Sequence, residues 1–154
     1  MSSEARRAAV SALIALAGSA DFRDRADAGR GLAGFAETAR ARRALSDLVV
    51  DADDTFVTLE TARALLRRQD GIGLAVVASA LATADPGRAD WIGHAVLDVF
   101  GVFARDRDAA VRECEVLTRD PDERVRRGVG QLIGMLTEID PVLHPEQDDL
   151  PRPP

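Results

Sequence analysis

Residues 120–133 read DPDERVRRGVGQLI, an acidic start followed by apolar residues at helical spacing. Asp120 suits a helix N-cap, because its carboxylate can accept hydrogen bonds from the free amides of the first turn. Pro121 fits the first helical position, where a missing N–H costs nothing, and Glu123 completes a capping-box-like arrangement. The apolar residues behind this start share one helix face: Val125, Val129, Leu132, Ile133 and Leu136. The stretch therefore predicts an amphipathic helix that begins at Asp120.

Three earlier segments begin in the same way, at Asp21, Asp53 and Asp85, and the four starts are spaced by 32, 32 and 35 residues. Pro86 follows Asp85 as Pro121 follows Asp120. An apolar stripe at helical spacing follows each earlier start: Ala28, Leu32 and Phe35; then Val57, Thr61, Ala62, Leu65 and Leu66; then Ile92, Val96, Val99 and Phe103. A period in this range indicates an array of helical repeats.

Shorter second helices are expected between these first helices, over residues 39–50, 72–83 and 109–118. Helix-breaking residues mark the turns: 51–53, 70–71, 84–87 and 106–108. No stretch alternates between apolar and polar residues long enough to predict a strand. The sequence therefore predicts an all-α fold of about four helix pairs.

The segment 120–133 resembles the HEAT-repeat pattern, in which Asp precedes Val-Arg, two small core residues and an apolar pair. The first copy fits the same frame with Arg25, Ala28, Gly29 and Leu32, and the second fits it with Val57, Ala62 and Leu65. The third copy departs from it, because Ala89 and Asp90 stand where Val-Arg is expected, and Trp91 and His94 are unusual there. The resemblance covers roughly residues 21–137. Its repeats are shorter than the ~40–47 residues of typical HEAT units, and they look like the short bacterial form of phycobilin-lyase-type HEAT proteins.

The resemblance implies a right-handed α–α superhelix with its first helices on the convex side and its second helices on the concave side. Such arrays mostly bind other proteins, and a few relatives act on DNA or attach bilins. The domain organisation expected from it is an N-terminal capping helix over 1–20, HEAT-like repeats over 21–139 and a disordered, proline-rich acidic tail over 140–154.

Composition limits the classes of function. The chain has 154 residues, 46% hydrophobic and 30% charged, and a net charge of −6, which argues against a general nucleic-acid or anionic-membrane binder. All its basic residues are Arg, as a GC-rich genome tends to give. Residues 1–20 read as an amphipathic helix, with a signal peptide as the alternative. We therefore expect a cytoplasmic protein with no membrane span and no bound cofactor.

Candidate catalytic residues are few. Asp90, His94 and Asp98 share one helix face at i, i+4 and i+8, where two carboxylates beside an imidazole could serve catalysis, hold a metal or contact a partner. A solvated polar face is the simpler interpretation, and no metal site is predicted. Cys114 lies on an apolar stripe and is expected to be a small buried residue.

The segment 72–84 has no charged residue, which would suit a helix buried on all sides, an alanine-rich helix that tolerates exposure, or an apolar strip for a partner. The side chains predicted to surround a partner are Arg40, Arg43, Asp47, Ser79, Ala82 and Glu113. The leading hypothesis is a scaffold that binds a protein or peptide on its concave face. A lyase-like or peptide- or small-molecule-modifying enzyme and a DNA-binding HEAT protein remain as alternatives, and the sequence does not indicate the oligomeric state.

Overall fold

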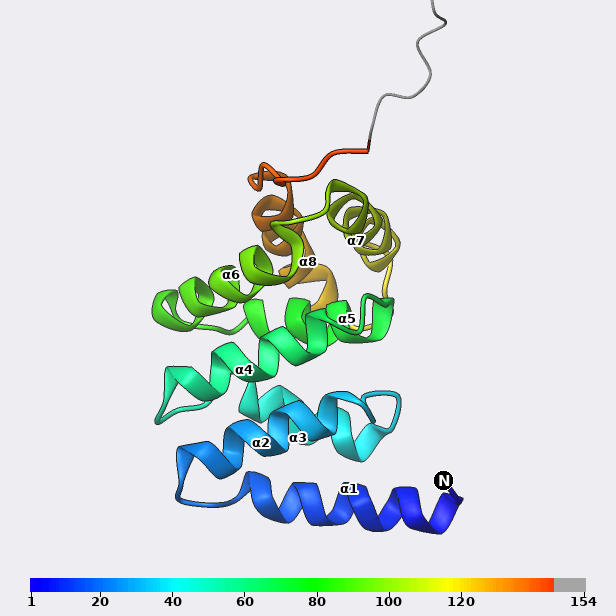
Figure 1. The fold of residues 1–154 in the computed structure, drawn as a ribbon, viewed down its shortest axis with the longest axis vertical. Helices are drawn as coiled ribbons and strands as arrows, with labels where there is room; N and C mark the ends of the chain where they lie inside the picture. The colour runs from blue at the N-terminus through cyan, green and yellow to red at the C-terminus, as the bar shows by residue number, and fades with distance from the viewer. Residues whose placement is uncertain (146–154) are drawn as a thin grey trace, which may run out of the picture.

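The computed structural model describes residues 1–145, and this part of the chain forms eight α-helices and no strand (Figure 1). The helices are α1 (Ser3–Ala17), α2 (Phe22–Ala33), α3 (Ala39–Leu48), α4 (Thr55–Leu66), α5 (Gly71–Leu81), α6 (Pro86–Phe100), α7 (Ala104–Leu117) and α8 (Glu123–Thr137). The predicted all-α class is confirmed. None of the described helices is both long and apolar enough to cross a membrane.

The helices pack in two layers (Figure 1). In one layer α2 packs on α4 and α4 packs on α6, while in the other α3 contacts α5 and α5 contacts α7. Helix α1 packs on both α2 and α3 at the beginning of the array. The buried side chains between the layers are almost all Leu, Val, Ile and Ala, as the low aromatic content requires.

Helix α8 packs mainly on α5 and also on α7, and its contact with α6 is small. The approach to α5 is very close, because a Cβ placed on Gly128 would lie 1.7 Å from the carbonyl oxygen of Ala78. Helix α5 is thus surrounded by α3, α4, α7 and α8. This enclosure explains its lack of charge, since Val77 and Ala78 are fully buried and a charge there would lose its hydration.

The predicted helix starts are right at two positions and displaced at the other two. Asp21 accepts a hydrogen bond from the Arg23 amide and caps α2, and Asp85 caps α6 with Pro86 at the first position. The cap of α4 is Asp54, one residue after the predicted Asp53.

The prediction that Asp120 caps the last helix is wrong, because the cap of α8 is Asp122. The Asp120 carboxylate instead accepts from the Asp122 amide at 2.9 Å and closes the turn that precedes the helix. Glu123 is therefore the first residue of α8 and forms no capping box with Asp120.

The predicted turn over 106–108 is also wrong, since α7 begins at Ala104 and includes these residues. Phe103 was expected on the α6 stripe, but it lies beyond the end of α6, is 41% exposed and occupies the N-cap position of α7. The amides of Asp106 and Arg107 donate to the carbonyl oxygen of Phe103 in the first turn of this helix, and the Arg107 side chain donates to the carbonyl oxygen of Ile139 at 2.7 Å.

The first residues of the predicted tail pack against the α6–α7 junction. Val142 and Leu143 donate backbone hydrogen bonds to Gly101 and Val102 at 3.1 and 2.7 Å, and Leu143 accepts one from Ala104 at 2.8 Å. Leu143 and Phe103 thus form an isolated parallel bridge, and Pro141 is buried. The part of the predicted tail over 146–154 lies outside the described residues.

Candidate functional site

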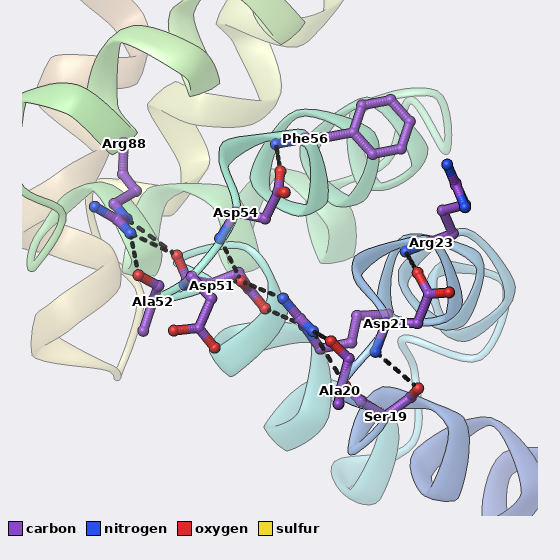
Figure 2. A network of polar contacts seen from close by, with 11 residues as sticks. Ser19, Ala20, Asp21, Arg23, Asp51, Ala52, Asp54, Phe56 and Arg88 are labelled. Atoms are coloured by element: carbon purple, nitrogen blue, oxygen red, sulfur yellow. Dashed lines mark hydrogen bonds and ion pairs between the residues drawn. The ribbon is translucent and has the colours of Figure 1, made fainter.

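A polar network joins the α1–α2 loop, the α3–α4 loop and the first turn of α6 (Figure 2). Arg25 of α2 donates to both carboxylate oxygens of Asp51, at 2.8 and 3.1 Å, and to the carbonyl oxygens of Ser19 and Ala20 at 3.1 and 3.0 Å. Arg88 of α6 donates to the carbonyl oxygen of Asp51 at 3.0 and 2.9 Å. The network therefore ties the loops before α2 and α4 to each other and to the first turn of α6.

Asp51 also organises its own turn, because its Oδ1 accepts from the amides of Asp53 and Asp54 at 3.0 and 2.9 Å. Burial raises the pKa of the Asp51 carboxyl, but the hydrogen bonds from Arg25 and from these two amides outweigh burial and leave it below its ordinary value of 3.8. Asp51 is thus a charged structural group rather than a proton donor.

The candidate binding site is a groove on the α3–α5–α7 side, with a volume of about 620 Å³. Helix α5 forms its apolar floor, helix α3 one wall, and the α7–α8 loop with the start of α8 the other. The floor residues are Ile72, Ala75, Val76 and Ser79. These side chains, except for the buried Val76, are half-buried, so a ligand could remove further apolar surface from water.

The two walls of this groove carry opposite charges. Arg42 and Arg43 lie on the α3 wall, and Asp120 and Asp122 lie on the other. Arg42 donates to the carbonyl oxygen of Glu37 at 3.2 Å, whereas the exposed Arg43 has no ion-pair partner within residues 1–145. The groove thus offers one uncommitted cation opposite two carboxylates.

The structure separates the residues predicted to contact a partner. Arg43 and Ser79 both line the groove, and Glu113 approaches its Gly71 end, with Oε2 3.2 Å from the position that a Cβ on Gly71 would take. Arg40 lies elsewhere and donates to the Ser11 hydroxyl of α1 at 3.2 Å.

The other two predicted contacts lie away from the groove. Asp47 lines a second cavity at the α3–α4 loop. The backbone of Ala82 lies at the α8 crossing, with its amide 3.0 Å from the position of a Cβ on Gly128. Sequence reasoning missed the wall residues Arg42, Asp120 and Asp122. The charges of these residues are visible in the sequence. The sequence does not indicate that their loop lies opposite α3, because that depends on where α8 crosses α5.

The three catalytic candidates lie on one exposed face of α6, but they do not form a joint site. Asp98 is paired with Arg63 of α4, whose Nε donates to it at 2.8 Å. The His94 ring instead contacts the Trp91 ring, with their centroids 5.2 Å apart. Asp90 is exposed and forms no ion pair in the described part of the chain. Within residues 1–145 no group of three His, Cys, Asp or Glu side chains is placed to hold a metal ion.

Cys114 is fully buried in the core between α7 and its neighbours. Burial raises the pKa of its thiol to about 12, with smaller contributions from Glu113 and Glu115. Because the thiolate is the reactive form, Cys114 is unsuited to nucleophilic chemistry at neutral pH.

Comparison with known proteins does not assign a function to this site. No family model and no curated protein match the chain. Among solved structures, the crystal structure of an engineered protein matches 83% of the chain at 21% identity, with a TM-score of 0.35. The chain spans 62% of the length of that protein. A likeness at this TM-score supports no argument about function.

Proposed function

We propose that the protein is a HEAT-like helical-repeat scaffold that binds a protein or peptide segment in the groove between α3, α5 and the α7–α8 loop. The observation that carries the proposal is the apolar α5 floor between walls of opposite charge. Burial of the floor supplies the driving force, at roughly 25 cal/mol per Å² of apolar surface. The wall charges set the direction of the segment and its rate of encounter more than its affinity.

A repeated local contact supports the HEAT-like part of the proposal. Arg25 Nη1 donates to the carbonyl oxygens of Ser19 and Ala20, six and five residues before it. Arg126 Nη1 donates to Asp120 and Pro121, again six and five residues before it, at 2.5 and 2.9 Å. The two arginines occupy matching positions in the sequence pattern. The first and last copies therefore use the same pair of hydrogen bonds to hold the turn that precedes the helix.

Selection of peptides by display on the immobilised protein tests the groove. The enriched peptides should shift the amide NMR signals of Ile72, Ala75 and Ser79, and their affinity should fall at least about tenfold in Ser79→Arg, because the long side chain fills the floor. Ala15→Arg on the exposed face of α1 is the matched control and should bind normally.

Two results would count against the proposal. One is a selection that enriches no peptide. The other is a set of peptides that bind Ser79→Arg as well as they bind the wild type. Ala82→Arg would test packing rather than binding, because Ala82 lies at the α8 crossing.

A further inference from the structure

A second cavity, of about 830 Å³, opens at the edge formed by the α1–α2 and α3–α4 loops. It lies apart from the groove and shares none of its lining residues. A smaller cavity of about 360 Å³ adjoins it, since Val50 and Ala52 line both. The two cavities follow the same loop edge from one helix pair to the next.

One part of the lining of the larger cavity is apolar. Its residues come from the end of α1, from α3 and from the turn after α3, and they are Ile14, Ala17, Ala44, Leu48 and Val50. All of these except Leu48 are only half-buried. The cavity is thus suited to an aliphatic chain, which would lose water contact on both of its sides.

The buried pair Arg25–Asp51 also lines the cavity, but it offers no net charge to a ligand. Arg25 is committed to Asp51 and to two carbonyl oxygens, and Asp51 accepts from Arg25 and from two amides. In the adjoining cavity Arg88 is likewise committed, to Asp85 at 3.1 Å and to the carbonyl oxygens of Asp51 and Ala52. The basic groups of this edge are therefore used within the fold.

Two carboxylates at the rim have no such partner. Asp47 and Asp53 are exposed, line the cavity, and form no ion pair within residues 1–145. The backbone of Asp53 is fixed by the hydrogen bond from its amide to Asp51 at 3.0 Å. The cavity thus combines an apolar wall between α1 and α3 with a rim charge of −2.

We propose that this cavity binds the Lys or Arg side chain of a basic segment in a partner protein. The aliphatic stem would pack between α1 and α3, and the cationic head would lie between Asp47 and Asp53, the arrangement that long basic side chains prefer at apolar surfaces. An acidic or purely apolar side chain fits less well, because it would repel or desolvate the two carboxylates. This cavity shares no lining residue with the groove, so binding at one does not depend on binding at the other.

The probe is Nα-acetyl-lysine methylamide, with the norleucine analogue as a matched compound that lacks the ammonium group. Titration followed by amide NMR should give a saturable Kd in roughly the millimolar range, the affinity expected of a ligand this small. The shifts should centre on Ala17, Ala20 and Asp53. The norleucine analogue should bind at least several-fold more weakly.

The variant Asp47→Asn/Asp53→Asn should weaken the lysine probe about tenfold or more, as loss of two charge-assisted contacts does. The control Asp90→Asn/Glu115→Gln changes the net charge equally at exposed positions outside both cavities, and it should bind as the wild type. Ser79→Arg, which blocks the groove, should also leave binding of the lysine probe unchanged. A failure of the proposed cavity site can therefore be distinguished from a failure of the proposed groove.

Several outcomes would overturn the inference. Equal weakening in both double variants would mean general attraction of a cation to an acidic protein. Equal binding of the lysine and norleucine probes would remove the role of the carboxylates. Shifts that do not saturate, or that lie outside the cavity, would remove the site itself.

Discussion

Arg25 and Asp51, 26 residues apart in the sequence, form a bidentate ion pair. Their side chains are 10% and 9% exposed. The pair joins α2 to the α3–α4 loop, and Arg88 extends the connection from that loop to α6. Removal of one member of a buried pair leaves the other charge without compensation, which is far more costly than the net value of the pair.

Asp51→Ala should therefore lower the free energy of unfolding by about 3–5 kcal/mol, measured by urea denaturation. Asp53→Ala, at an exposed position in the same turn, should stay within about 0.5 kcal/mol of the wild type. Because Asp51→Ala could fail to fold, the double variant Arg25→Met/Asp51→Leu provides a second measurement. It should recover much of the loss, and equal losses in Asp51→Ala and Asp53→Ala would contradict the structural role of the pair.

The acid sensitivity of the fold should depend on Asp51 and Glu60. Burial raises the pKa of Glu60, but hydrogen bonds from Arg30 and Arg63 outweigh it and leave this pKa below the ordinary 4.5, as Arg25 does for Asp51 below 3.8. A carboxyl whose pKa is depressed by folding stabilises the protein above its unfolded pKa, and this stability is lost as the pH falls through the folded pKa.

The stability difference between the wild type and Asp51→Asn/Glu60→Gln should therefore be largest near neutral pH and shrink as the pH falls below about 4.5. Urea denaturation over a pH series measures it. A difference that stays constant down to about pH 2 would show that neither carboxyl has a depressed pKa.

The crossing of α8 over α5 should not tolerate a side chain at Gly128. A methyl group there would lie 1.7 Å from the Ala78 carbonyl oxygen, a backbone atom that cannot rotate away, so the helices would have to separate. Gly128→Ala should destabilise the protein by about 3 kcal/mol, the upper range for overpacking.

Gly130 is the matched control for Gly128, because it lies in the same helix and a Cβ there would meet nothing within 4 Å. Gly130→Ala should stabilise the protein by up to about 1 kcal/mol, through the better helix propensity of alanine. Changes of the same sign at the two positions would mean that α8 does not cross α5 as described.

Cys114 should be unreactive in the folded protein. With its thiol pKa raised to about 12 by burial, native protein at neutral pH should react with a thiol reagent orders of magnitude more slowly than protein unfolded in guanidinium. The reaction can be followed by the absorbance of the thiolate that an aromatic disulfide reagent releases. Rapid stoichiometric labelling of folded protein would place Cys114 at the surface.

The segment after α8 can be tested by two truncations. A chain that ends at Leu143 keeps its bridge to Phe103, and its Tm should stay within about two degrees of the full chain. A chain that ends at Asp140 loses the buried Pro141 and the three backbone hydrogen bonds of Val142 and Leu143, and its Tm should fall by several degrees more. A fall of several degrees in the first truncation would show that residues beyond Leu143 contribute to the fold.

Local signals in the sequence were enough to predict most of the helical segments, though not the first turns of α7. The 3.6-residue period of the apolar stripes and the Asp caps act within a few residues, so the all-α class, the caps at Asp21 and Asp85 and the buried Cys114 followed from them. The error at the start of α8 arose where two local signals competed, because the choice between Asp120 and Asp122 depends on which carboxylate the turn uses for itself.

Only the tertiary structure could decide which helices meet. Gly128 in the sequence permits a close approach, but nothing near it indicates that its partner is Ala78 of α5 rather than a residue of α6. The same crossing brings Asp120 and Asp122 to face Arg43 across the groove, and it moves Ala82 away from the predicted partner site. Contacts between distant segments depend on how whole helices pack, and this packing is a property of the complete core rather than of any one stretch.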